Sequence, residues 1–139
     1  MSKTIIQKVV FKNTTAKTLY DLYMNAKQHS KIAGSPVKIS AKTGEKFSAH
    51  GNYINGRNIH LVKNKQIIQT WRAAGWDRSA VDSIFMINLE QSGKDTILDM
   101  VHAYLPEKEV AGVKKGWTAH YWNPWKQHIA GKPITRPAM

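Results

Sequence analysis

The side chains that could do chemistry are scattered along the chain and form no recognised catalytic or metal-binding motif. Six histidines and nine carboxylates stand among 139 residues, and cysteine is absent. The pattern H-E-x-x-H of zinc peptidases and the pattern G-x-S-x-G of serine hydrolases do not occur. His120 and His128 are eight residues apart, so on a helix their rings lie too far from each other to share one ion. We therefore predict no catalytic residue, no metal and no cofactor.

Two polar side chains could nevertheless meet a ligand inside the protein. Leu98, Met100 and His102 alternate with Asp99, so a strand would turn them to opposite faces. The apolar residues favour the His102 side as the core, which leaves Asp99 outside. His102 is then either a hydrogen-bonded core histidine or a polar anchor for a ligand. Arg72 is either a charged strand end or the anchor of an anionic headgroup.

Three large rings near the C-terminus bear on whether the interior is solid or hollow. Trp117, Tyr121 and Trp125 are spaced by four residues, so they share one face of a helix. Pro124 removes a backbone donor, and a kink is expected near His120. The stripe either seals the core or lines a pocket. For the second case we predict a cavity wall made of Phe47, Trp71, Phe85, Met100, Trp117 and Tyr121.

The elements that would position these residues follow from the apolar pattern. A strand at Thr4–Lys12 precedes a helix that begins after residues 13–15, and a second short helix covers about Lys27–Ile32. Short β segments follow at Val37–Ser40, Lys46–Ala49, Asn52–Ile54, Arg57–Val62 and Gln66–Arg72, with Asn55-Gly56 as a two-residue hairpin turn. Two longer strands are joined at residues 91–94, and the last helix spans about Lys108–Ile129. Residues 1–130 form one domain, and 131–139 are an extended or disordered tail.

This order of elements predicts an α+β fold. One strand, two helices, a run of antiparallel strands and one long helix follow each other along the chain. A single amphipathic helix is narrower than the sheet that it must cover. A strongly curved antiparallel sheet wrapped around the C-terminal helix solves this, and it can leave an apolar cavity between the two.

The composition restricts the other classes of function. The formal net charge is +12, but the lysines are dispersed and outnumber the arginines. We therefore expect a solvated basic surface without a specific nucleic-acid site, and weak, salt-dependent adsorption to polyanions. No apolar run reaches the length of a membrane span, and the first residues lack the features of a signal peptide. The expected location is cytoplasmic.

Several separated motifs resemble one known family. The pattern Gly-Trp-x-x-His-Tyr-Trp-x-Pro at residues 116–124 looks like the closing motif of the C-terminal domain of the activator of the heat-shock protein 90 ATPase. The same family pattern is followed, in the same order, by Gly44–Ser48, Tyr53–Gly56, Ile68–Arg72, Gly75-Trp76 and Thr96–Pro106. The resemblance thus runs from about Lys3 to Ile129.

The resemblance implies a helix-grip fold, in the superfamily (START, SRPBCC) that includes steroidogenic lipid-transfer domains, the birch-pollen allergen and polyketide cyclases. It also implies a stand-alone bacterial domain with a place in the stress response. Such a domain is without the N-terminal domain through which the eukaryotic activator also grips its chaperone, so that activity is not carried over. Tyr104 stands where the family usually has glycine. Its ring would narrow the cavity or move its opening toward the last helix.

Three functions are open at this point. The first is a binding module that holds a small apolar or amphipathic ligand beneath Trp117, Tyr121 and Trp125. The second is a protein-interaction module that contacts a chaperone partner through its surface. The third is a cyclase-like enzyme with His102 as acid or base, which is the least favoured because no catalytic constellation accompanies it.

Overall fold

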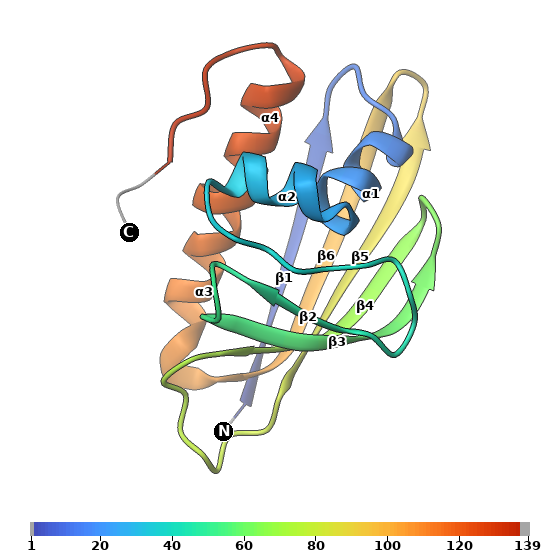
Figure 1. Cartoon of the computed structure of the whole chain (residues 1–139). Helices are drawn as coiled ribbons and strands as arrows, with labels where there is room; N and C mark the ends of the chain where they lie inside the picture. The colour runs from blue at the N-terminus through green and yellow to red at the C-terminus, as the bar shows by residue number, and fades with distance from the viewer. Residues whose placement is uncertain (1, 137–139) are drawn as a thin grey trace.

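The computed structural model describes residues 2–136. Its antiparallel sheet has the strand order β1-β6-β5-β4-β3-β2, and helices follow the first and the last strand (Figure 1). The strands are β1 (Ser2–Phe11), β2 (Lys46–Ala49), β3 (Ile54–Val62), β4 (Gln66–Ala73), β5 (Ser83–Ser92) and β6 (Asp95–Pro106). The α+β architecture predicted from the sequence is thereby confirmed.

Two capped helices, α1 (Ala16–Met24) and α2 (Ala26–Ala33), cross one end of the sheet (Figure 1). The side chain of Thr15 accepts from the amide of Thr18, and Asn25 starts α2 in the same way by accepting from Gln28. Gly34 ends α2 with a φ of 69°, a left-handed conformation that glycine adopts without steric cost.

The C-terminal helix is one helical run with an irregular turn in its middle. It consists of η1 (Glu107–Glu109), α3 (Val110–Trp117), the π-helical turn η2 (Thr118–Trp122) and α4 (Asn123–Ile129). The amide of Asn123 donates to the carbonyl of Thr118, five residues earlier. Pro124 has no amide hydrogen to offer to His120, so the disturbance expected near His120 takes the form of a π turn.

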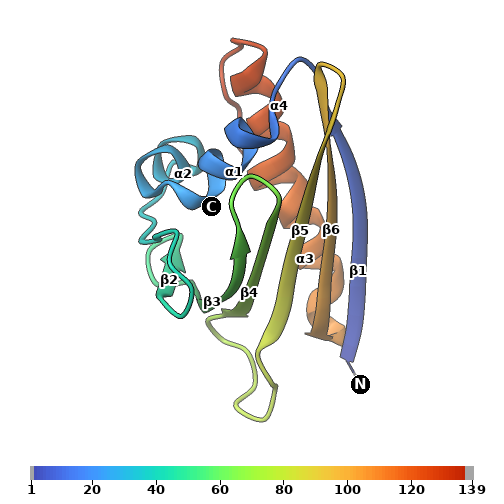
Figure 2. The same ribbon diagram turned by 90° about the vertical axis from the view of Figure 1, so that its right-hand side faces the viewer.

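The sheet curls so that its two ends lie on different sides of the fold, with the C-terminal helix running across the concave side (Figure 2). A register shift between Asn58 and His60 interrupts the pairing of β3 with β4, and such irregularities increase local bending. In β6, Leu98, Met100 and His102 face the core as predicted. Asp99 lies on the outer face, 4.0 Å from the ammonium of Lys8.

The hairpin turn predicted at Asn55-Gly56 is wrong, because both residues lie inside β3. Strand β3 is also continuous, where the sequence suggested two segments. The chain turns instead at residues 50–53, where His50 and Gly51 have φ values of 52° and 70°. Gly56 is required by a close approach of backbones: a Cβ there would lie 1.9 Å from the carbonyl oxygen of Thr70.

Two further segments differ from simple strand or coil. Val37–Ser40 was predicted as a strand but forms only an isolated bridge, between Lys38 and Ser48. Residues 131–136 run back along α4, where Gln127 exchanges hydrogen bonds with Thr135. Residues 137–139 of the predicted tail lie outside the described part of the chain. Within residues 2–136, no helix has both the length and the hydropathy needed to cross a membrane.

Candidate functional site

A cavity of about 300 Å³ lies between the C-terminal helix and the strands β3 and β4, and it is partly open to solvent. We call it the helix–sheet cavity. Five aromatic residues form part of its wall: Tyr53, Trp71, Trp76, Trp117 and Tyr121. Smaller side chains complete the wall, namely Ile54, Ala73, Gly112, Val113 and Gly116. Polar groups are supplied by His50, Lys108, Glu109 and His120. The site is therefore apolar and aromatic, with a few polar groups at its margin.

Two glycines of the helix keep this cavity open. Gly112 and Gly116 are four residues apart, so they lie on one face of α3 and both line the cavity. A Cβ at Gly112 would meet no atom within 4 Å, and one at Gly116 would come no closer than 4.0 Å to the His120 ring. Because the helix presents no side chain at these positions, the space beside them stays unfilled.

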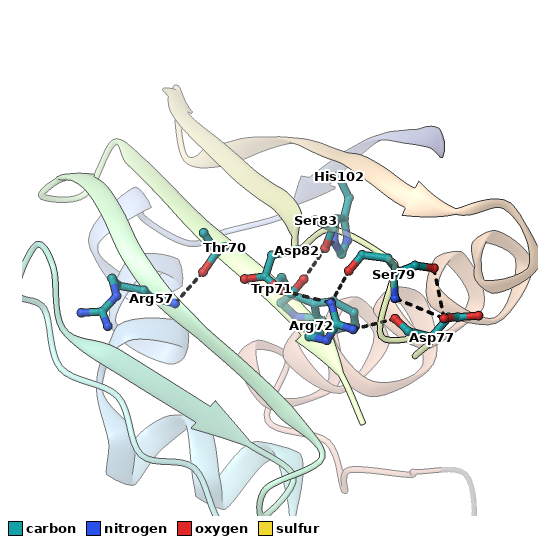
Figure 3. A network of polar contacts seen from close by, with 10 residues as sticks. Arg57, Thr70, Trp71, Arg72, Asp77, Ser79, Asp82, Ser83 and His102 are labelled. Atoms are coloured by element: carbon teal, nitrogen blue, oxygen red, sulfur yellow. Dashed lines mark hydrogen bonds and ion pairs between the residues drawn. The ribbon is translucent and has the colours of Figure 1, made fainter. Parts of the chain in front are cut away.

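His102 lies in the core, and both of its ring nitrogens form hydrogen bonds with protein groups. Figure 3 shows the contact with Ser83. The indole N–H of Trp117 donates to Nδ1 of His102 at 3.1 Å. Burial lowers the pKa of His102 to about 3, so the neutral ring carries its proton on Nε2. That proton is donated to the Ser83 hydroxyl, at 2.8 Å, and the hydroxyl donates to the Trp71 carbonyl. His102 is therefore the hydrogen-bonded core histidine, the first of its two alternatives.

The same chain of hydrogen bonds argues against the cyclase-like enzyme. Ser83 and His102 have the spacing of a nucleophile and a base, but a base must accept the hydroxyl proton. Here Nε2 is the donor, and the hydroxyl proton is used on a backbone carbonyl. Ser83 and His102 are fully buried, and neither lines the helix–sheet cavity.

Arg72 holds the loop between β4 and β5 and does not line the helix–sheet cavity (Figure 3). Its guanidinium donates to the carbonyls of Asp77, at 2.7 Å, and Ala80, at 2.6 Å. It also contacts the Asp82 carboxylate at 3.4 Å and lies 5.9 Å from the ring centre of Trp76. Arg72 thus fixes the loop that carries one wall of the cavity, instead of meeting a ligand directly.

A second chain of hydrogen bonds joins His29, Tyr121 and His50, and the last two of these residues line the helix–sheet cavity. His29 Nδ1 is 2.9 Å from the carbonyl of Tyr23, which can only accept, so Nδ1 carries the proton. Burial lowers the pKa of His29 to about 4, and its Nε2 therefore accepts from the Tyr121 hydroxyl. The Tyr121 oxygen in turn accepts from Nε2 of His50, at 3.2 Å. This leaves Nδ1 of His50 buried, unprotonated and without a protein partner.

The neighbouring imidazoles of His50 and His120 give the cavity its polar character. Their ring centres are 5.8 Å apart, and burial is the main cause that lowers the pKa of each. Both rings are therefore neutral near pH 7. Within residues 2–136 no cluster of three or more histidine, cysteine or carboxylate side chains could hold a metal ion.

The residues predicted as the cavity wall divide into two groups. Trp71, Trp117 and Tyr121 line the helix–sheet cavity. Phe47, Phe85 and Met100 are buried in the core and do not line it. Phe85 stacks on Trp117, with the two ring centres 4.3 Å apart and the ring planes nearly parallel.

Tyr104 does not narrow the cavity, contrary to the expectation from the sequence. Its side chain is exposed and lines a separate surface hollow beside Val81 and Pro106. Its φ of 63° lies in the left-handed region, which explains why glycine suits this position. Most of the lining residues were not predicted from the sequence, among them His50, His120, Trp76 and the two helix glycines. For the glycines, the i, i+4 spacing beside the aromatic stripe was the available signal.

A curved antiparallel sheet that grips one long helix, with a partly open cavity between them, defines this protein as a helix-grip domain. The family model described as Activator of Hsp90 ATPase homolog 1-like protein matches residues 13–129. The chain belongs to this family, and the resemblance seen in its motifs is confirmed.

Two curated relatives show how much of the family's longer proteins the chain represents. An activator of 90 kDa heat shock protein ATPase homolog from Dictyostelium discoideum is 30% identical over 99 residues, which are 70% of this chain and 26% of the relative. Homolog 1 of the same activator from Homo sapiens is 25% identical over 114 residues, 82% of this chain and 33% of the relative. The chain thus spans about a quarter to a third of the length of these relatives.

Solved structures share the fold. An HSP90 activator from Plasmodium falciparum superposes with a TM-score of 0.80 at 22% identity, covering 97% of this chain and 99% of that one. The Aha1 dimer from Colwellia psychrerythraea gives a TM-score of 0.76 at 12% identity, covering 91% and 96%. At these identities the likeness shows the fold alone.

Proposed function

We propose that this protein binds a small aromatic or apolar molecule in the helix–sheet cavity. The observation that carries the proposal is a partly open space of about 300 Å³ walled by three indoles and held open by two helix glycines. This volume lies at the lower end of the range for small-molecule sites, so it suits a ligand of one or two fused rings. A cytoplasmic location is part of the same proposal.

The polar groups of the cavity restrict the ligand further. His102 and Arg72 were the anchors expected from the sequence, but both are used on protein groups. His50 and His120 line the cavity in their place, and the neutral ring of His120 can accept one hydrogen bond from a ligand. A ligand with a single hydroxyl or N–H at one end of an apolar ring system matches this arrangement.

The test uses naphthol as probe and the indole N–H signals of the five tryptophans as reporters. In a two-dimensional NMR titration we expect the signals of Trp71, Trp76 and Trp117 to move, because their rings line the cavity. The signals of Trp122 and Trp125 should stay in place. Tryptophan emission should fall in parallel with the NMR shifts.

A matched pair of variants makes the test specific. Gly116→Leu places a side chain into the cavity, and replacing a helix glycine favours the helix by about 1 kcal/mol, so the fold should persist. Ala111→Leu adds the same side chain to the exposed part of α3. We expect Gly116→Leu to lose naphthol binding and Ala111→Leu to keep it. Equal binding by both variants would exclude the cavity as the site.

A second candidate function is contact with an Hsp90 chaperone, and membership of the activator family is the observation that favours it. The chain covers only part of its longer relatives, so the extent of any ATPase activation is open to measurement. The experiment is an ATPase assay of Hsp90 with and without the chain, paired with direct binding. Absence of binding at micromolar concentrations would remove this role and leave the ligand proposal untouched.

A further inference from the structure

The positive charge of this protein is strongly segregated along the chain. Residues 22–44 contain four lysines, residues 110–136 contain four lysines and one arginine, and neither stretch contains an acidic residue. The remainder of the chain carries twelve basic and nine acidic residues, which nearly balance. Most of the net charge of +12 therefore resides in these two stretches.

The fold brings the α2 part of the first stretch beside the α4 and tail part of the second. Helix α2 packs against α4, and the guanidinium of Arg136 donates to the carbonyls of Lys31 and Ile32 at the end of α2. Lys27 and Lys31 are four residues apart and share one side of α2. We define the basic face as Lys27, Lys31, Lys126, Lys132 and Arg136, all of which are exposed.

The cations of the basic face are not neutralised within the protein. Five ion pairs occur among the described residues, and all of them use lysines or arginines from elsewhere. A hollow of about 500 Å³ also lies between the C-terminal helix and the returning tail, with Lys126 and Arg136 on its border. The other residues of this hollow are uncharged: Ala119, Asn123, Gln127 and Thr135. The surface is therefore both positive and indented.

We propose that the basic face binds an acidic segment of a partner protein. This deepens the partner-binding role proposed above and rests on that role only for the identity of the partner. The basic face supplies dispersed, solvated ammonium groups, which suit the carboxylates of a protein surface and give fast, salt-sensitive association.

Two other classes of partner fit the basic face less well. Nucleic-acid recognition favours arginine, yet Arg136 is the one arginine here and its guanidinium is used on backbone carbonyls. Membrane binding needs large apolar side chains beside the cations. Among the described residues, the exposed large apolar side chains lie elsewhere: Ile6, Val10, Tyr53, Ile59, Val62, Val81 and Tyr104.

The experiment compares two triple variants of equal charge. The first, Lys27→Glu with Lys31→Glu and Lys126→Glu, reverses the basic face. The control, Lys63→Glu with Lys65→Glu and Lys94→Glu, reverses exposed lysines in the β3–β4 and β5–β6 turns. Both lower the formal net charge from +12 to +6. The probe is a fluorescein-labelled synthetic peptide in which Asp or Glu alternates with Gly or Ser, followed by anisotropy at about 0.15 M salt.

We expect the basic-face variant to weaken peptide binding by about tenfold or more, and the control variant by about twofold. Equal weakening in both variants would show a bulk charge effect and overturn the proposal, whether or not Hsp90 binds. Tighter binding of a duplex DNA of equal charge, lost in the same variant, would assign the surface to nucleic acid and also overturn it. Direct binding of Hsp90 to the unmodified protein separately decides the partner-binding role.

Discussion

The two halves of the C-terminal helix differ in what they place against the sheet. The first half, α3, presents Gly112 and Gly116 toward β3 and β4, and a cavity remains. Beyond Tyr121, which still lines the cavity, the helix presents Trp122 and Trp125, which are almost completely buried. One helix therefore fills one end of the concave sheet and leaves the other end hollow, and the glycines and tryptophans that it presents differ greatly in side-chain volume.

The two ends also differ in how well their buried polar groups are hydrogen-bonded. At the filled end, the indole N–H of Trp122 donates to the Gln7 side chain at 2.8 Å. At the hollow end, Nδ1 of His50 is one of two buried side-chain polar atoms without a partner among the described residues. An unpaired buried polar atom costs stability, and such costs concentrate where a protein binds something. In the ligand-binding role proposed above, the filled end stabilises the fold and the hollow end provides the site.

Trp125→Ala should have the largest effect and tests the filled end. The ring of Trp125 is buried and lies 5.3 Å from that of Trp122 and 5.9 Å from that of Phe11. Its removal should lower the free energy of unfolding by about 3–5 kcal/mol, through lost burial and the cavity left behind. Urea unfolding followed by circular dichroism measures this. A loss below about 1 kcal/mol would mean that this end is not tightly packed.

The next largest effect is a pH dependence of the free energy of unfolding, which comes from the buried His102. His102 has a pKa of about 3 in the folded protein against 6.5 for a free histidine. Above pH 6.5 the ring is neutral in both states, but at lower pH only the unfolded chain takes up the proton. This histidine should therefore lower the free energy of unfolding by about 1.4 kcal/mol for each pH unit between these pKa values.

The variant His102→Gln should remove the part of the slope that His102 contributes, because its amide can still accept from Trp117 and donate to Ser83 but does not titrate. His29, whose pKa burial lowers to about 4, keeps its own contribution. The control is His128→Gln, at an exposed position of α4. Urea midpoints between about pH 6.5 and 4.5 give the comparison. If His102→Gln kept the full slope of the unmodified protein, the ring of His102 would not be held neutral in the folded state.

Much of the fold could be predicted from the sequence because its signals are local and repeated. The alternation in β6 placed His102 inside and Asp99 outside, and Gly34 marked the end of α2. The hairpin turn predicted at Asn55-Gly56 was wrong because the same dipeptide occurs both in hairpin turns and where two strands approach each other closely. Only the distance from Gly56 to Thr70, fixed by the pairing of β3 with β4, distinguishes the two.

The site was less predictable from the sequence, because the cavity depends on positions without a side chain, Gly112 and Gly116. The aromatic stripe correctly identified large buried rings, but it omitted Trp122, because an ordinary α-helix would turn that residue away. The π turn brings residues five apart together, and Trp122 stacks on Trp117 with ring centres 5.5 Å apart. Ser83 and Trp117, the hydrogen-bond partners of His102, likewise come from two separate elements, β5 and α3, which no spacing in the chain reveals.

Trp76→Ala should have the smallest effect on stability and the clearest effect on binding. Trp76 lies on the loop held by Arg72, with its ring 5.8 Å from that of Trp71 and one side toward the cavity. Because that side already borders open space, its loss should cost only about 1 kcal/mol of unfolding free energy. Naphthol binding should weaken by about tenfold, since the ligand loses one of its three indole walls. Trp76→Phe, which keeps an aromatic ring, should restore most of the affinity. A loss of stability as large as that of Trp125→Ala would instead make Trp76 part of the filled core, and the division between the two ends would fail.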